Sequence, residues 1–126
     1  IYDVPQKNFD QKIEELTALL DLKEILHIPV RRLSLGERMK CEIAASLLHS
    51  PEILFLDEPT IGLDVVSQLR IRNFLREYNE RTGITVILTS HYMADIEALC
   101  RRVLVIDHGQ LMFDGELREL AARVTD

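Results

Sequence analysis

Two acidic residues directly after a short apolar run are the first chemical signal in the sequence. The run extends from Ile53 to Leu56, and Asp57 and Glu58 follow it. When adjacent carboxylates end a strand, one can hold a hard cation, usually through water, and the next can orient or deprotonate an attacking water. That chemistry suits phosphoryl transfer. Taken alone, however, the pair is better explained as a strand that leaves the core for solvent.

A second apolar run, residues 84–89, is followed by Ser90 and His91. A histidine in this position is most often solvated or satisfied by a hydrogen bond. If the two runs are neighbouring parallel strands, their carboxyl ends lie at the same edge of a sheet, which is where ligands bind in such folds. We then expect His91 close to Glu58, where an imidazole that can carry positive charge suits a developing phosphate charge.

The segment from Ser34 to Glu37 has the features of a helix start and of an anion site. Ser34 and Glu37 have the spacing of a capping box. Gly36 lies between them, where it costs about 1 kcal/mol of helix propensity relative to alanine. Because a helix N-terminus presents free N–H groups and the positive end of its dipole, the two interpretations are compatible.

The spacing of apolar residues predicts the elements that position these groups. Two buried strands separated by a helix indicate a βαβ unit with a right-handed crossover, hence an α/β fold with a parallel sheet. A hairpin is expected around His108 and Gly109. The predicted helices cover residues 10–20, 22–26, 34–49, a segment between 64 and 83, 92–99 and 116–124, and the strands cover 53–56, 84–89, 102–107 and 110–113.

Composition places the chain among soluble globular proteins. It has 126 residues, of which 47% are apolar and 29% are charged, so disorder and collagen-like repeats are excluded. The net charge of −6 argues against a protein whose whole surface is shaped for nucleic acid, although local basic spots stay compatible with it. Cys41 and Cys100 lack the spacing of a metal or disulfide framework, which favours a reducing, cytoplasmic setting. No apolar stretch approaches the roughly 20 residues of a membrane-spanning helix.

Four short segments, taken in order, resemble the motifs of one family. Residues 33–37 are Leu-Ser-Leu-Gly-Glu, 53–60 are Ile-Leu-Phe-Leu-Asp-Glu-Pro-Thr, 62–64 are Gly-Leu-Asp, and 89–91 are Thr-Ser-His. They resemble the signature motif, Walker B strand, D-loop and H-loop of ABC-type ATPases, the nucleotide-binding subunits of ABC transporters. The resemblance implies a P-loop NTPase-type, mostly parallel sheet with flanking helices, plus the end of a helical subdomain and a C-terminal hairpin.

The resemblance also implies roles in ATP hydrolysis for three of the residues above. Asp57 would bind Mg²⁺, Glu58 would act as the general base on the attacking water, and His91 would contact the terminal phosphate of ATP. Glu58 and His91 are therefore the expected catalytic residues. ATP and Mg²⁺ are the expected cofactors.

Further roles follow from the head-to-tail dimer of the family. Ser34, Gly36 and Glu37 would face ATP held by a second nucleotide-binding subunit, and Asp64 would communicate across that interface. Transmembrane permease subunits are the other implied partners, with no nucleic acid. The implied location is cytoplasmic, peripheral on the cytoplasmic face of the cell membrane.

The sequence departs from the family pattern in two respects that limit what the chain is expected to do alone. Leu35 stands where the family has glycine, and Glu37 where it has glutamine. The 126 residues also contain no GxxxxGK[ST] loop and begin at Ile1 without methionine. We therefore expect the C-terminal part of one nucleotide-binding domain, inactive alone. Residues 1–50 would end the helical subdomain and include the signature helix, and 51–126 would carry the Walker B, D-loop, H-loop and hairpin elements.

The interpretation carried forward is an ATPase subunit that powers transport. Residues 90–97 and 107–110 look most like the ATPase components of bacterial export systems with separate membrane subunits. Two alternatives stay open: a soluble ABC ATPase of DNA repair, chromosome organisation or translation, and a non-catalytic dimerisation partner of an active ATPase. Retention of both Glu58 and His91 argues against the second.

Overall fold

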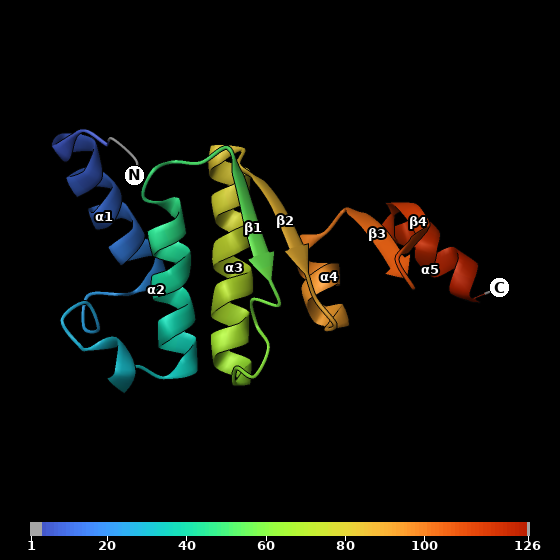
Figure 1. The fold of residues 1–126 in the computed structure, drawn as a ribbon, viewed down its shortest axis with the longest axis horizontal. Coiled ribbons are helices and arrows are strands. Elements are labelled where there is room, and N and C mark those ends of the chain that lie inside the picture. Colours follow the sequence, from blue (N-terminus) through green and yellow to red (C-terminus); the bar gives the residue numbers. More distant parts are fainter. Residues whose placement is uncertain (1–3, 126) are drawn as a thin grey trace. The chain divides into compact units, whose positions relative to one another are not determined.

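A computed structural model describes residues 4–125, which form two compact units (Figure 1). The first ends at Ser90 and the second begins at His91. The elements of the first unit are α1 (Gln6–Leu20), the 3₁₀ turn η1 (Val30–Arg32), α2 (Leu35–Leu47), β1 (Ile53–Asp57), α3 (Val65–Thr82) and β2 (Thr85–Thr89). Those of the second unit are α4 (Met93–Leu99), β3 (Arg102–Asp107), β4 (Gln110–Glu116) and α5 (Leu117–Thr125).

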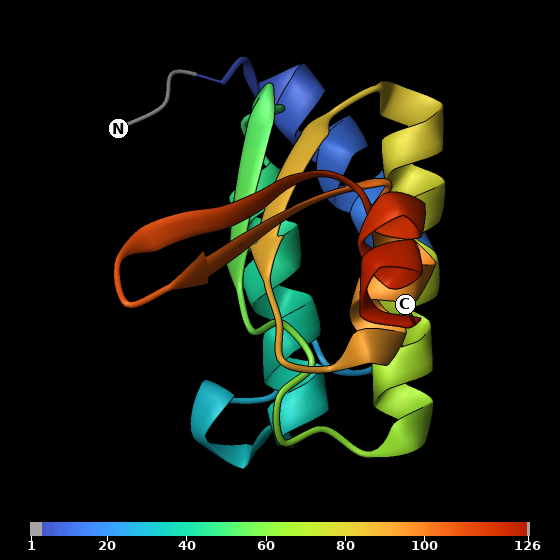
Figure 2. The ribbon, with the colours of Figure 1, turned by 90° about the vertical axis from the view of Figure 1, so that its right-hand side faces the viewer.

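The strand, helix, strand order predicted for the first unit is confirmed. β1 and β2 pair in parallel, with the register running from Ile53 opposite Thr85 to Asp57 opposite Thr89. Figure 2 shows the two strands side by side and running in the same direction. α3 connects them and ends at Gly83, which has a positive φ of 72° and caps the helix in the left-handed conformation. The carboxyl ends of both strands therefore meet at one edge.

The expectation that these strands are buried on both faces is wrong for the described part of the chain. Leu54 is 5% exposed, but its neighbour Phe55 is 72% exposed. Because side chains alternate along a strand, the two residues belong to opposite faces of the sheet. An unbroken apolar run is expected where both faces are covered, and here only the Leu54 face is packed.

The core of the first unit lies among its three long helices. α1 contacts both α2 and α3, and α2 contacts α3; Figure 1 shows α2 and α3 side by side. The side chains buried deepest in these helices are Leu16, Leu20, Ile43, Leu47, Ile71 and Leu75, each at most 4% exposed. The apolar spacing that predicted the helices therefore marks the faces that pack together.

The short second helix expected near residues 22–26 is absent from the structure, which has turns there. α1 ends at Leu20 and is capped by Asp21, whose backbone is left-handed with φ 55° and so cannot continue the helix. A single turn follows, in which the N–H of Leu26 donates to the carbonyl oxygen of Leu22 at 3.1 Å. Leu22 and Ile25 are 2% and 8% exposed, so burial alone accounts for the apolar pattern.

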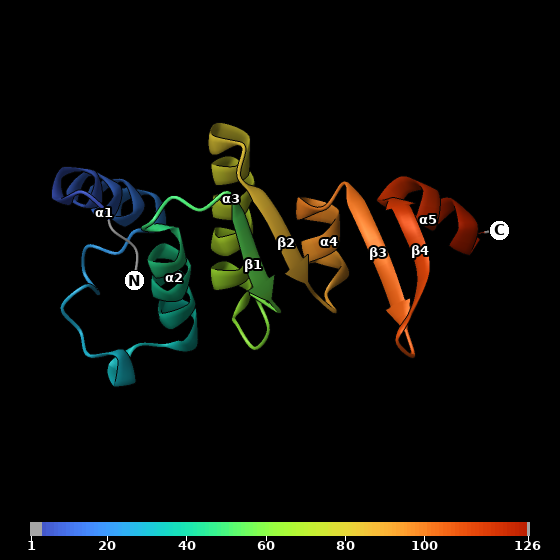
Figure 3. The same ribbon diagram turned by 45° about the horizontal axis from the view of Figure 1, so that its top comes forward.

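The second unit contains the predicted hairpin. β3 and β4 pair antiparallel, with an irregularity between Val105 and Ile106, and both turn residues, His108 and Gly109, have positive φ. Two consecutive positive φ values are the requirement of a tight type I′ turn. β4 runs to Glu116, three residues beyond the prediction, and α5 follows it directly (Figure 3). None of the helices among residues 4–125 is long and apolar enough to cross a membrane.

Candidate functional site

The two acidic residues at the end of β1 are held by the last residue of β2. The Thr89 hydroxyl donates to Oδ1 of Asp57 at 2.5 Å and accepts from the backbone N–H of Glu58 at 3.1 Å. The same N–H lies 3.0 Å from the carbonyl oxygen of Thr89. These three hydrogen bonds connect residues that are about thirty positions apart. They fix the acid pair at the carboxyl edge of the sheet, where the sequence predicted it.

The backbone of Glu58 is strained, since its φ of 48° is left-handed. Such a conformation costs a residue with a side chain roughly 1–3 kcal/mol and persists only where the surroundings hold it. Here the hydrogen bonds to Thr89 hold it on one side. The following Pro59 and Thr60 are fully buried and anchor it on the other. The strained conformation changes the direction of the chain at the acid pair. Backbone strain of this kind clusters at functional sites.

The donor set of the acid pair fits Mg²⁺ held largely by water. Within residues 4–125, no group of three or more His, Cys, Asp or Glu side chains could form a ready-made metal cage. Asp57 is exposed, and only one of its oxygens, Oδ1, accepts the Thr89 hydroxyl. Mg²⁺ keeps several waters and takes one or two carboxylates together with phosphate oxygens. A single accessible carboxylate therefore suits that ion better than a cation that needs many protein ligands.

The capping box predicted at the start of α2 is present. The N–H of Glu37 donates to Oγ of Ser34 at 3.1 Å, and the N–H of Ser34 donates to Oε1 of Glu37 at 2.9 Å. The backbone and side-chain hydrogen bonds from Ser34 lower the pKa of the Glu37 carboxyl. Both polar side chains are engaged in the cap, and their role toward an anion stays a prediction.

The first turns of α2 and α3 meet at Ser67. Its N–H and hydroxyl donate to the two carboxylate oxygens of Asp64 at 3.1 and 2.6 Å, which caps α3 and lowers the pKa of that carboxyl. A Cβ added at Gly36 would lie only 2.7 Å from Oγ of Ser67. The structure thus brings the predicted residues Gly36 and Asp64 to a common neighbour, with Ser34 and Glu37 on the adjacent helix start.

His91 is the first residue of the second unit and lies two residues before α4. Its expected proximity to Glu58 stays a prediction.

Two residues of the site were missed by the sequence analysis. Thr89 was noted only as part of the H-loop segment, although pairing the ends of the two strands would have placed it opposite Asp57. Ser67 follows Asp64 by three positions, the spacing at which an N-cap carboxylate accepts a backbone N–H. In both cases the sequence already indicated the contact, through the spacing of polar residues at the ends of strands and the starts of helices.

A parallel strand pair joined by a helix, with acids at its carboxyl edge, is an α/β arrangement whose ligands bind at that edge. Residues 5–93 match the sequence model of a family described as "AAA domain, putative AbiEii toxin, Type IV TA system", and the chain belongs to that family. Its homologues are ABC transporter ATP-binding proteins that share 31–37% identity with it over most of its length.

Two curated relatives illustrate the similarity. The linearmycin resistance ATP-binding protein LnrL of Bacillus subtilis is 35% identical over 98% of this chain and 40% of its own length. The methionine import ATP-binding protein MetN of Haemophilus ducreyi is 35% identical over 98% of this chain and 36% of its own length. The chain therefore spans less than half the length of these relatives.

Solved structures confirm the fold. CbiO1 from Clostridium perfringens, described as part of the ABC transporter complex cbiONQ, matches with a TM-score of 0.83 and 27% identity over 97% of this chain and 49% of its own. The dimeric ABC transporter cassette MJ0796 matches with a TM-score of 0.77 and 23% identity over 94% of this chain and 51% of its own. The predicted α/β cassette fold is thus confirmed.

Proposed function

We propose that this chain works as the ATP-hydrolysing subunit of an ABC transporter. The observation that carries the proposal is the pair Asp57 and Glu58, held by Thr89 at the carboxyl edge of two parallel strands. Similarity to ABC transporter ATP-binding proteins supports it. The 126 residues contain no GxxxxGK[ST] segment, so we propose that hydrolysis takes place in an assembly that supplies a phosphate-binding loop, and that the chain alone is inactive.

The proposed roles within the site follow from the chemistry of the side chains. Asp57 holds Mg²⁺, which when bound supplies positive charge against the phosphate oxygens. Glu58 accepts a proton from the attacking water, and its fixed backbone orients the carboxylate for that transfer. His91 donates a hydrogen bond to the terminal phosphate. Positioning and charge stabilisation are the main requirements of phosphoryl transfer, and these three residues address both.

The proposed assembly is a head-to-tail dimer of nucleotide-binding subunits, together with transmembrane permease subunits. Ser34, Gly36 and Glu37 face ATP held by the second subunit, and Asp64 communicates across the interface between the subunits. The similarity of the fold to the dimeric cassette MJ0796 supports this arrangement. Residues 1–126 then form the C-terminal part of one nucleotide-binding domain, located at the cytoplasmic face of the cell membrane.

For the direction of transport, we propose export. The names of the relatives support both directions, since one is a resistance protein and another an import protein at the same 35% identity. The resemblance of residues 90–97 and 107–110 to the ATPases of bacterial export systems favours export. Reconstitution of the assembly in vesicles, with transport measured in each direction, tests this choice.

The test of the proposed activity is steady-state ATP hydrolysis by the assembly, purified from its source through a tag on this chain. Glu58→Gln removes the general base and keeps the size of the side chain, so hydrolysis should fall by about 10²–10⁴-fold while nucleotide binding persists. Wild-type assembly that does not hydrolyse ATP would contradict the proposed activity. Undiminished hydrolysis in the variant would remove only Glu58 from the mechanism.

Glu52→Gln is the matched control for that experiment. Glu52 is an exposed acid directly before Ile53, the first residue of β1. Its backbone carbonyl oxygen accepts a hydrogen bond from the N–H of Thr85 at 3.0 Å. The substitution is chemically the same as at Glu58 and leaves that backbone contact in place. Hydrolysis by this variant should match the wild type.

A further inference from the structure

A lysine lies on the buried face of α2. The buried residues of this helix are Gly36, Lys40, Ile43, Ala44 and Leu47. Lys40 thus occupies a position at which the helix spacing calls for an apolar residue, and it is only 8% exposed. The aliphatic part of the side chain supplies this burial, and the ammonium group itself stays open to solvent, because no buried side-chain nitrogen or oxygen in the described residues lacks a hydrogen-bond partner.

Within residues 4–125, Lys40 interacts electrostatically with Glu37, one turn earlier on α2, but its ammonium group has no direct partner. The ammonium group of Lys40 has no hydrogen bond and no ion pair within 4.0 Å among those residues. The same holds for the guanidinium group of Arg70, which projects from α3. Two cations without direct counter-charges therefore belong to neighbouring helices of one unit.

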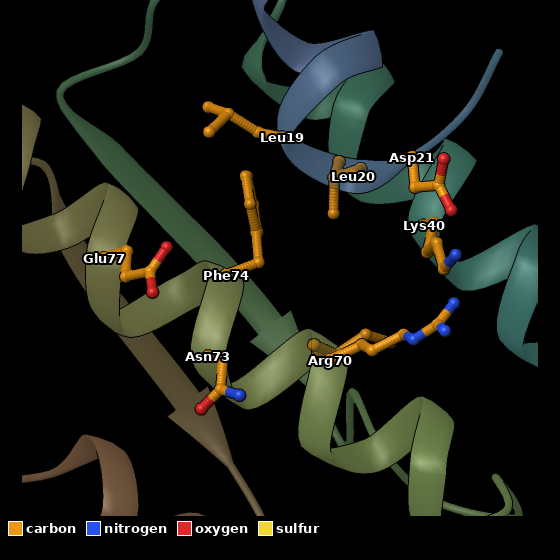
Figure 4. A pocket seen from close by; sticks show the side chains of 9 residues that line it. Leu19, Leu20, Asp21, Lys40, Arg70, Asn73, Phe74 and Glu77 are labelled. Carbon is orange, nitrogen blue, oxygen red and sulfur yellow. The ribbon is translucent and has the colours of Figure 1, made fainter.

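Both cations line the same pocket, which lies between α1, α2 and α3 and has a volume of about 320 Å³. Figure 4 shows that the side chains of Lys40 and Arg70 reach from α2 and α3 into the same part of this pocket, with their nitrogen atoms facing one another. Leu20 and Phe74 contribute apolar wall. The volume is at the lower end of the roughly 300–1,000 Å³ typical of small-molecule sites.

We propose that this pocket binds a compact oxyanion of the phosphate class between Lys40 and Arg70. Two like charges that face one another in a partly closed space repel, and a doubly charged anion between them would neutralise both. The guanidinium group can donate two parallel N–H bonds to such an anion, and the ammonium group adds a strong point charge. The site is separate from the acid pair of β1, so it stands whether or not the proposed ATPase activity does.

Two acidic residues of the pocket lower its affinity for an anion. Asp21 and Glu77 also line the pocket, and within the described residues neither forms an ion pair with the two cations. Their negative charges oppose anion binding, which favours a small anion that fits close to the two nitrogens over a large acidic ligand. Replacing Asp21 with Asn should therefore tighten binding.

The experiment uses the 126-residue chain and inorganic phosphate as the probe. Phosphate is titrated against chloride at matched ionic strength, with ¹H–¹⁵N NMR shifts and thermal unfolding as readouts. The wild type should show saturable shifts around Lys40 and Arg70 and a rise in Tm, since a ligand that binds only the folded state stabilises it. Lys40→Met and Arg70→Met should each weaken binding about tenfold or more, as expected for loss of a charge-assisted hydrogen bond.

Arg38→Met is the matched control, because Arg38 lies exposed on α2 and does not line the pocket. Its phosphate affinity should equal that of the wild type. Lys40→Met is expected to fold, since Met suits the buried face, and Arg70→Met tests the site at an exposed position. Equal effects of phosphate and chloride, or wild-type phosphate affinity in both pocket variants, would overturn the proposal.

Discussion

The hydroxyl group of Thr89 connects the two residues of the acid pair. It is the donor to the Asp57 carboxylate and an acceptor for the Glu58 N–H, at 2.5 and 3.1 Å. A single side chain thus determines the orientation of one acid and supports the strained backbone of the other. Thr89 is a positioning residue in the proposed mechanism, since it acts through both acids.

Thr89→Val tests this role, because it removes the hydroxyl and keeps the β-branched shape of the side chain. We expect ATP hydrolysis by the assembly to fall about 10–100-fold, the usual effect of removing a group that orients a ligand-bearing side chain. Thr89→Ser, which restores the hydroxyl, should recover most of the activity. Equal Tm losses in both variants with unchanged kcat would assign Thr89 a structural role only.

The two capping carboxylates, Glu37 and Asp64, make stability depend on acid pH. Hydrogen bonds from Ser34 lower the pKa of Glu37, and those from Ser67 lower that of Asp64. A carboxyl with a lowered folded-state pKa contributes stability above its unfolded pKa, and that stability is lost as the pH falls through the folded pKa. We expect the free energy of unfolding to decline below about pH 4, the range of unperturbed Asp and Glu.

Asp64→Asn separates this effect from the other acids. Asparagine is also a good N-cap but does not titrate, so the variant should lose less stability than the wild type between pH 5 and 3, as measured by urea unfolding at each pH. An identical pH dependence in the two proteins would mean that Asp64 is not a source of the acid sensitivity.

The close approach of α2 and α3 requires a glycine. A Cβ at position 36 would be 2.7 Å from Oγ and 3.0 Å from Cβ of Ser67, both too short for ordinary contact. Gly36 therefore has a structural reason to be present that does not depend on nucleotide. The same contact joins the start of α2 to the cap of α3, since Ser67 also donates to Asp64.

Gly36→Ala should therefore destabilise the chain by about 1–3 kcal/mol, the range for overpacking a tight contact. This sign is opposite to the gain of ~1 kcal/mol that alanine gives over glycine in an open helix. In a Ser67→Gly background, which removes both clashing atoms, Gly36→Ala should become neutral or stabilising. Urea unfolding of the four proteins gives the coupling energy, and simple additivity would contradict the steric explanation.

The sheet of the first unit has an apolar face that the described residues leave exposed. Ile53 and Ile87 are each 49% exposed and Phe55 is 72% exposed. Among residues 4–125 this sheet has two strands, so each strand also has an edge that none of those residues pairs with. Exposed apolar faces and strand edges favour association with other chains.

We expect the isolated chain to self-associate as its concentration rises, and Phe55→Thr to reduce this association. Threonine has the β-branched shape that suits a strand, and the substitution removes the largest exposed ring. Sedimentation velocity over a concentration series measures the effect, with far-UV circular dichroism to confirm an unchanged fold. A wild-type chain that stays monomeric throughout the series would contradict the expectation.

The capping box at Ser34, the strand, helix, strand order and the turn at His108 and Gly109 were all predictable from the sequence. Each depends on residues within a few positions of one another or on the periodicity of one segment, so local physical chemistry determines them. The acid pair after β1 was predictable for the same reason. The short helix near residues 22–26 was predicted wrongly, because burial of Leu22 and Ile25 in a turn produces the same apolar spacing.

The contacts that hold the candidate site were decided only by the tertiary structure. Thr89 meets Asp57 because two strands pair in one register, and Ser67 requires glycine at position 36 because two helices pack closely. The exposure of Phe55 and the meeting of Lys40 with Arg70 in one pocket likewise depend on which elements become neighbours. These features join residues that are far apart in the chain. Whether two such residues meet depends on how the elements pack, and the local conformational preference of either residue does not determine that.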